Sequence, residues 1–289
     1  MPARKNPPTA TNAGILRPDE FARHVELTRW PAGTLEEWVE NFWGLRWSLP
    51  AGSSYLSHVL PHPACTVSVE HATCPRPGLP PRAVVVTGVV TRRFDTVVAG
   101  EGAVVGVKLR PGGLAALTGQ SAKAWTDRDV PAVDVLPAGV AATLHRIDPR
   151  AVLERGPARI EEALAPLAIR DNDDPTYARL LAVVADMLQD RALLTVAQVE
   201  DRHGVSERTL QRWFSHYVGV GPKWVLARYR MHDVVTELDD GYAGSLADLA
   251  ARHGWYDQSH FVRDFRALTG VTPGEYAAPV TPRSAPPTG

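Results

Sequence analysis

The C-terminal part of the chain carries one sequence pattern twice, and this repeat limits the folds that the region can adopt. The first copy runs over residues 195–222 and the second over residues 245–273, with one extra residue in the second copy after Gly254. Ala197, Arg202, His203, Gly204, Arg212, Phe214, Gly219, Val220 and Pro222 match Ala247, Arg252, His253, Gly254, Arg263, Phe265, Gly270, Val271 and Pro273, in that order. A tandem repeat predicts two structural units of the same design.

Each copy predicts two short helices joined by a tight corner. Thr195 and Gln198 form a capping-box pattern at the start of the first copy. Gly204 and Gly254 stand where a helix ends on a residue in the left-handed conformation. A second helix follows each glycine, and its expected N-cap is Ser206 in the first copy and Asp257 in the second.

This geometry is that of a helix-turn-helix unit, whose second helix lies in the major groove of DNA. The polar faces of the two second helices carry groups that read bases or hold phosphates. They comprise Glu207, Arg208, Gln211, Arg212 and Ser215 in the first copy, and Gln258, Ser259, His260, Arg263 and Arg266 in the second. Residues 223–238 predict a helix between the copies that spans roughly 25 Å, enough to set two units about one DNA turn apart.

The region 193–276 resembles the DNA-binding domain of AraC/XylS-type bacterial transcription regulators. The resemblance rests on SERTLQRWF at 206–214, GVGPKWVLARYRM at 219–231 and LADLAARHGWYDQSHFVRDFRALTGVTPGEY at 246–276. It departs from the family at Trp255, where the family often has Phe. The resemblance implies that both recognition helices enter successive major-groove segments on one face of the DNA. By position, the implied DNA-binding residues are Ser206, Arg208, Thr209, Arg212, Gln258, Ser259, His260 and Arg263.

The residues ahead of the repeat predict a second domain. The chain has 289 residues and 44% hydrophobic content, which suffice for two cores. Strand-like runs between 55 and 109 are separated by Pro and Gly, as in a small antiparallel barrel or sandwich, and 114–192 turns helical. The expected fold class is α+β: a β-rich N-terminal sensor or regulatory domain with a helical linker, followed by an all-α tandem helix-turn-helix domain.

The expected boundaries follow from these patterns. They are a disordered tail at 1–20, a regulatory α+β domain at 21–170, the DNA-binding domain at 176–277 and a second disordered tail at 278–289. Residues 176–280 are expected to fold alone, because both helix pairs and their linker lie inside that span. The segment KLRPGGLAALTGQSAKAWTDRDVPAVDVL at 108–136 more loosely resembles an uncharacterised regulator domain associated with the same family, and this implies no particular ligand.

Four tryptophans gather in the first part of the regulatory domain. Trp30, Trp38, Trp43 and Trp47 lie within eighteen residues of one another. Large aromatic side chains are usually core, but they also line small-molecule pockets, so both interpretations stay open. The RPGG turn at 110–113 lacks the following Lys-Ser/Thr of a phosphate-binding loop, which argues against a nucleotide site.

A group of His and Cys residues leaves two alternatives open. His58, His62, Cys65, His71 and Cys74 crowd together, and zinc uses such ligands, so a metal- or thiol-responsive regulator is one alternative. The Cys-x-x-Cys spacing is absent, however, and alternation along CTVSVEH would send its side chains to opposite faces of a strand. The other alternative is a Cys-dependent DNA-repair protein fused to the same domain, although no general base stands next to Cys74.

A helical module that binds only protein is a further interpretation, against which the arginines on both recognition helices argue. Residues 191–276 hold ten Lys/Arg against eleven Asp/Glu, so weak non-specific DNA affinity is expected, with specificity from base contacts. No apolar run of about 18 residues and no secretory signal are present, which favours a cytoplasmic location. The expected partners are double-stranded promoter DNA, RNA polymerase, a small-molecule effector and a second copy of the chain. No enzymatic activity, cofactor, metal or membrane contact is expected, and activation or repression stays open.

Overall fold

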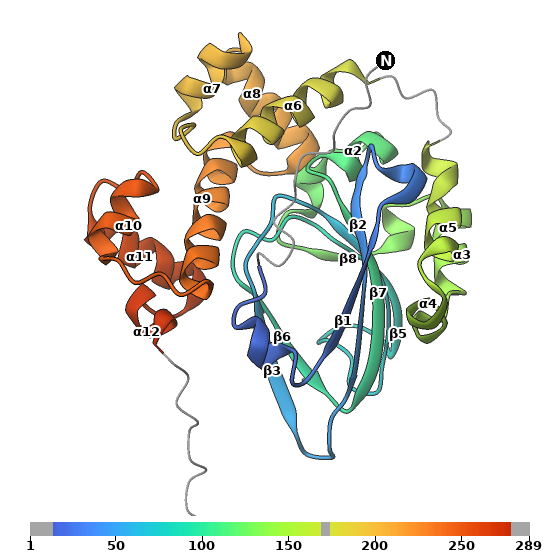
Figure 1. Ribbon diagram of the computed structural model, residues 1–289. Helices are drawn as coiled ribbons and strands as arrows, with labels where there is room; N and C mark the ends of the chain where they lie inside the picture. Colours follow the sequence, from blue (N-terminus) through green and yellow to red (C-terminus); the bar gives the residue numbers. More distant parts are fainter. Residues whose placement is uncertain (1–13, 169–173, 279–289) are drawn as a thin grey trace, which may run out of the picture.

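The structure is a computed structural model that describes residues 14–168 and 174–278, and its class is α+β (Figure 1). The expected tails at 1–13 and 279–289 lie outside the described residues. The expectation of disorder is wrong for residues 14–20. Ile15 forms a bridge with Val59, Leu16 is buried, and α1 (Pro18–Phe21) begins two residues later. These residues are ordered because they pair with a strand and bury apolar surface.

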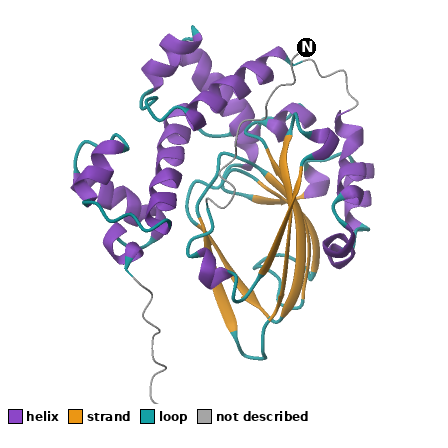
Figure 2. Ribbon diagram, in the orientation of Figure 1, coloured by secondary structure: helices purple, strands orange, loops and turns teal. Residues whose placement is uncertain are grey.

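The N-terminal part is built on an antiparallel sheet of six strands in the order β1-β2-β7-β4-β5-β8 (Figure 2). The bounds are β1 (Glu26–Pro31), β2 (Val39–Ser48), β7 (Glu101–Leu109), β4 (Thr66–Ala72), β5 (Arg82–Thr87) and β8 (Asp129–Pro131). A separate ribbon of two strands, β3 (Ser54–Val59) and β6 (Phe94–Ala99), stands apart from this sheet. The expected antiparallel β-rich domain is therefore present, although the sequence patterns did not single out β1 and β8.

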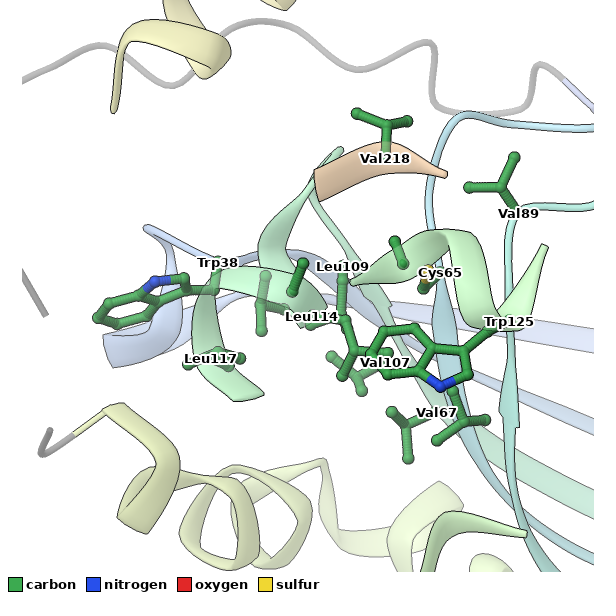
Figure 3. Packing of buried hydrophobic residues seen from close by; sticks show 14 of the residues in the cluster. Trp38, Cys65, Val67, Val89, Val107, Leu109, Leu114, Leu117, Trp125 and Val218 are labelled. Atoms are coloured by element: carbon green, nitrogen blue, oxygen red, sulfur yellow. The ribbon is translucent and has the colours of Figure 1, made fainter. Parts of the chain in front are cut away.

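Helices cover one face of the sheet and leave the other face turned toward the β3–β6 ribbon (Figure 1). The covering helices are α3 (Ala138–His145), α4 (Pro149–Arg155) and α5 (Ala158–Ala168), with short turns η1 (Gly33–Leu35), η2 (Ala122–Trp125) and η3 (Ala132–Asp134) and helix α2 (Gly113–Thr118) at the edge. Because strand residues alternate between faces, Phe42, Val67 and Val107 pack under these elements in the core. Figure 3 shows this packing around Val67, Val107 and Trp125.

The C-terminal part is helical throughout. It contains α6 (Pro175–Gln189), α7 (Val196–His203), α8 (Glu207–Trp213), the π-helical turn η4 (Phe214–Val218), α9 (Pro222–Asp239), α10 (Leu246–Arg252), α11 (Gln258–Thr269) and α12 (Pro273–Ala277). None of the helices in 14–168 and 174–278 is long and apolar enough to cross a membrane.

The four tryptophans divide between the two alternatives that the sequence left open. Trp38 is 9% exposed and belongs to the main core, and Trp30 is partly buried, packs against the same core and also borders the cavity. Trp43 and Trp47 point to the opposite face of β2 and line a cavity beneath the β3–β6 ribbon. Successive side chains of a strand point to opposite faces of the sheet. Trp30 is paired with Phe42, which lies on the core face. Trp43 and Trp47 are an odd number of residues from Phe42 along β2, so they lie on the other face.

The first helix-turn-helix unit shares its core with the sheet domain. Tyr177 of α6 is 1% exposed and donates a hydrogen bond of 3.2 Å from its hydroxyl to the carbonyl of Glu37. Val218 of η4 belongs to the same core as Cys65 and Val89 (Figure 3). Gly112 has a φ of 85°, and a Cβ atom there would lie 3.0 Å from Cβ of Tyr217, so glycine is required by both conformation and space.

The second unit has its own core, and the N-terminal segment contributes to it. Leu16 and Leu60 are buried with Val234, Phe261 and other side chains of α9–α12. Arg17 also lies over the ring of Tyr276, 5.3 Å from its centroid. Both units therefore contact the N-terminal part, and the autonomous folding of residues 176–280 stays a prediction.

Lowering the pH below 6.5 should destabilise the fold through His232, which α9 buries against the sheet domain. Its Nε2 lies 2.8 Å from the carbonyl oxygen of Pro61, and the ring is 3% exposed. Burial, aided by the charges of Lys108 and Arg228, lowers the pKa of His232 to about 3. Between pH 6.5 and 3, His232 is therefore protonated in the unfolded chain but neutral in the native chain. This contribution to stability is complete above pH 6.5 and is lost as the pH falls toward 3, by up to about 1.4 kcal/mol per pH unit.

Urea denaturation at several pH values measures this effect. His232→Gln should flatten the slope between pH 6.5 and 5, whereas the exposed His216→Gln should leave it as in the wild type. An identical slope in His232→Gln and the wild type would contradict the buried neutral imidazole.

Candidate nucleic-acid interface

The first unit is formed by α7 and α8, and local sequence signals set its corner. Thr195 and Gln198 make the expected capping box at the start of α7. Gly204 ends that helix with a φ of 59°. Ser206 caps α8 by accepting a hydrogen bond of 3.4 Å from the backbone N–H of Thr209. The predicted helix ends are confirmed, and together they hold the N-terminus of α8 at the surface.

The second unit, formed by α10 and α11, repeats this construction. Ser245 caps α10, and Gly254 follows it with a φ of 76°. Asp257 caps α11 by accepting a hydrogen bond of 2.7 Å from the backbone N–H of His260. Since α9 is one continuous helix of 18 residues, it separates the two units by about 27 Å along its axis.

The Arg-His pair that recurs in both copies ties each unit to the long helix before it. Arg202 lies 2.6 Å from Asp190, and His203 lies 3.1 Å from Asp186. In the second unit, Arg252 and His253 each lie 2.8 Å from oxygens of Glu237 on α9. The structural repeat is therefore a set of three helices, α6–α8 and α9–α11. Sequence matching found only the last two helices of each set, because α6 and α9 have the same packing role but little sequence similarity.

These ion pairs explain how a domain with near-neutral charge can present a basic face. The acidic residues that pair with Arg191, Arg202 and Arg252 lie on α9 and at the C-terminal end of α6, on the scaffold side. In the part of the chain that the structure describes, Arg208, Arg212, Arg263 and Arg266 are exposed on α8 and α11 and have no ion pair or hydrogen bond from their side chains. The positive charge therefore gathers on the recognition helices, although the domain as a whole carries no excess of basic residues.

The eight residues expected to bind DNA lie at two equivalent places, and their side chains differ in availability. Three already have intramolecular contacts: the hydroxyls of Ser206 and Thr209 lie 3.1 Å apart, and Nε2 of His260 lies 3.3 Å from Asp264. The others are exposed and have no side-chain partner among residues 14–168 and 174–278; they are Arg208, Arg212, Gln258, Ser259 and Arg263. Whether they contact DNA stays a prediction.

Tyr256 is a candidate that the sequence reasoning missed. It precedes the cap of α11 and is 94% exposed, the highest value among the exposed large hydrophobic side chains. An aromatic ring with a hydroxyl at the start of a recognition helix suits contact with a phosphate or sugar. The signal in the sequence was the Trp-Tyr dipeptide after Gly254. Trp255 is buried in the core of the second unit, whereas the side chain of Tyr256 remains in solvent.

The five His and Cys residues do not form one site. Cys65 is buried in the main core, whereas Cys74 is exposed. His58 lies 2.7 Å from Asp95, and His71 lies 3.7 Å from Asp148 on the opposite face of the sheet. The rings of His62 and His232 lie in contact, tilted by 31° with their centroids 4.2 Å apart. Within the described residues, no group of three or more His, Cys, Asp or Glu side chains is placed to hold a metal ion.

Substituting alanine for the corner glycines should destabilise both units, and Gly254→Ala should cost more. At Gly204 a Cβ atom meets no neighbour, so only the positive φ opposes alanine, at about 1 kcal/mol. At Gly254 a Cβ atom would also lie 2.8 Å from Cδ2 of Leu194. Urea denaturation measures the difference. Gly274→Ala in α12 is the control, because that Cβ meets nothing, and stability equal to Gly204→Ala would contradict the strained corner.

Comparison with known proteins gives matches for both parts of the chain. A family model described as a helix-turn-helix domain matches residues 200–278, and one described as a domain of unknown function (DUF6597) matches residues 28–131. A protein of Streptomyces lividans named as an AraC-like transcription regulator is 34% identical over 125 residues, which cover 43% of this chain and 38% of that protein. The regulatory protein HrpB of Ralstonia nicotianae is 29% identical over 125 residues, which cover 40% of this chain and 26% of HrpB.

The chain thus spans well under half the length of these curated relatives. Among solved structures, that of ToxT from Vibrio cholerae aligns over 88% of this chain and 98% of ToxT, at 11% identity and a TM-score of 0.39.

Proposed function

We propose that this chain, whose C-terminal part is an AraC-type helix-turn-helix domain, regulates transcription by binding promoter DNA through α8 and α11. The observation that carries the proposal is the pair of exposed arginines, Arg212 and Arg263, which occupy equivalent places in the two units and have no partner among the described residues. Unpaired guanidinium groups on a recognition helix bind guanine edges or phosphates.

The proposed contacts differ in kind along each helix. Arg208 and Arg212 read bases from α8, because they lie in its first two turns. Gln258, Ser259 and Arg263 do the same from α11, while Tyr256 contacts the backbone beside them. Ser206, Thr209 and His260 act mainly by holding the helix ends, since their side chains are engaged in contacts of their own.

The N-terminal domain is proposed to sense a small-molecule effector. A cavity of about 520 Å³ lies between the sheet and the β3–β6 ribbon, within the size range of ligand pockets. His62 lines this cavity, and its ring contacts the ring of His232 of α9, the helix that joins the two DNA-binding units. Occupation of the cavity therefore acts on the helix that sets the spacing of α8 and α11.

The remaining roles follow from this proposal. The chain works in the cytoplasm without catalysis, with RNA polymerase as a partner at the promoter and a second copy of the chain as a partner on longer operators. A cysteine-dependent enzyme or thiol sensor is less well supported, because burial raises the pKa of Cys65 to about 12 and keeps its thiol protonated.

Sequencing of the genomic DNA that the purified full-length chain retains tests the function. The expected result is a small set of promoters that share two short elements about one DNA turn apart. Retention of DNA that depends on the salt concentration but not on the DNA sequence would contradict a regulator of specific promoters. The absence of any retained DNA would contradict it as well.

A further inference from the structure

The cavity of the N-terminal domain is walled by two different surfaces. One wall is the face of β2, β7 and β4 that turns away from the helices, and the other is the inner face of the β3–β6 ribbon. Trp43 and Trp47 stand on the first wall, and Ser57 and Thr96 are paired directly across the second. The side chains of Leu56 and Val97 are exposed on the outer face of the ribbon, so the alternation of its strands turns the neighbouring pair, Ser57 and Thr96, inward.

Two glycines make room for the tryptophan rings on the sheet. Gly106 is paired with Trp43 and Gly102 with Trp47 in the register of β2 and β7. A Cβ atom on Gly106 would lie 2.5 Å from Cζ2 of Trp43, and one on Gly102 would collide with the ring of Trp47. The indole N–H of Trp47 donates to the carbonyl of Ala99 at 3.1 Å. The rings therefore lie low over β7 and line an apolar floor, where a flat ligand ring can stack.

The charged side chains that line the cavity already interact with other charged groups of the protein. Lys108 lies 2.7 Å from Glu40, whose side chain is 8% exposed. Arg76 lies 2.7 Å from Glu70 and 2.8 Å from Asp129. Arg29 interacts electrostatically with Glu40, the same carboxylate that pairs with Lys108. An ionised ligand would have to displace a buried partner or remain unpaired in an apolar space, and both cost free energy.

One neutral polar group in the cavity wall lacks a partner. The hydroxyl Oγ1 of Thr96 is buried and has no hydrogen bond within the described residues. A hydroxyl or carbonyl on a ligand would satisfy it without adding charge.

We infer that the cavity binds an uncharged, ring-bearing apolar molecule that stacks on Trp43 and Trp47 and carries a hydroxyl or carbonyl group for Thr96. This inference rests on the proposed function only in calling that molecule the effector. Binding in the cavity is measured without DNA, so a chain that binds the probe but no promoter would contradict the proposed function and leave this inference standing.

The test compares two fluorescent probes with the same ring system. N-phenyl-1-naphthylamine is neutral, and 1-anilinonaphthalene-8-sulfonate differs from it by one sulfonate. Each is titrated into the full-length chain at neutral pH, and the fluorescence gives its affinity. We expect the neutral probe to bind at least about tenfold more tightly. Equal or tighter binding of the sulfonate would overturn the uncharged class, and binding of neither would overturn the ligand site.

Matched variants locate the probe. Gly106→Ala pushes the ring of Trp43 into the cavity and should weaken the neutral probe roughly tenfold or more. Gly44→Ala is the control, because its Cβ would lie 2.5 Å from Cδ2 of Leu153 on the opposite face of the sheet. Circular dichroism checks folding, and Trp43→Leu replaces Gly106→Ala if the latter does not fold. Wild-type affinity in every cavity variant, or equal losses in Gly44→Ala, would overturn the assignment to the cavity.

The hydroxyl contact has its own comparison. 1-Naphthol should displace the neutral probe about three- to tenfold better than naphthalene does, and Thr96→Val should remove that preference. A preference that survives in Thr96→Val would overturn the role of Thr96.

Discussion

Replacing Arg212 and Arg263 together by alanine should weaken binding to a mapped operator by at least about thirtyfold, because each of the two lost contacts is worth about 1–3 kcal/mol. Both side chains are exposed on recognition helices, and neither has a partner among the described residues. Their loss therefore removes interactions with DNA and leaves no buried charge unpaired inside the protein. Thermal stability should be nearly unchanged for the same reason.

The measurement is fluorescence anisotropy with the operator and with scrambled DNA at several salt concentrations. If an arginine reads a base, its single variant loses preference at one position; if it holds a phosphate, affinity for all sequences falls alike and the salt slope flattens by about one unit. Arg159→Ala is the control, since Arg159 is an exposed arginine on α5 of the other domain. Wild-type affinity and selectivity in both Arg212→Ala and Arg263→Ala would place α8 and α11 outside the groove.

Phe265→Ala should lower the free energy of unfolding of the second unit by about 3–5 kcal/mol, the largest effect on stability that we expect. Its side chain is fully buried and packs edge-to-face on Phe261 and Tyr276, at centroid distances of 5.9 and 5.7 Å. The core of this unit is small, so the cavity left by the substitution removes a large share of its apolar packing. Affinity for DNA should fall with stability, because α11 loses its support.

Urea denaturation followed by circular dichroism measures the change, and Phe265→Leu should cost clearly less because it keeps most of the buried volume. Phe214 occupies the equivalent place in the first unit and is also fully buried, but there the core continues into the sheet domain. Phe214→Ala should therefore destabilise the whole chain, while Phe265→Ala unfolds the second unit first. A single common transition in both variants would contradict this difference.

The local architecture of the repeat could be predicted from the sequence. Thr195 with Gln198, Ser206 and Asp257 are the caps that the structure contains, and Gly204 and Gly254 have the expected positive φ. Such signals act over four or five residues, so they are complete within the chain segment that carries them. The helix-turn-helix prediction, which the family match confirms for residues 200–278, rests on the same local pattern.

Contacts between distant segments were beyond the reach of those signals. The burial of Leu16 in the second unit and of Val218 beside the sheet depends on packing between residues far apart in the sequence. The ion pairs of Arg202 and Arg252 likewise decide which arginines remain for DNA, and composition alone suggested too little positive charge.

The sequence by itself therefore determined the two helix-turn-helix units, since caps, corner glycines and helical periodicity are local. Only the tertiary structure decided that Trp38 packs in the core, that Trp43 and Trp47 line a cavity, and that Trp30 borders both. A shift of one residue in strand register would have exchanged those faces, and register is set by the pairing of residues more than sixty positions apart in the sequence, such as Trp43 with Gly106.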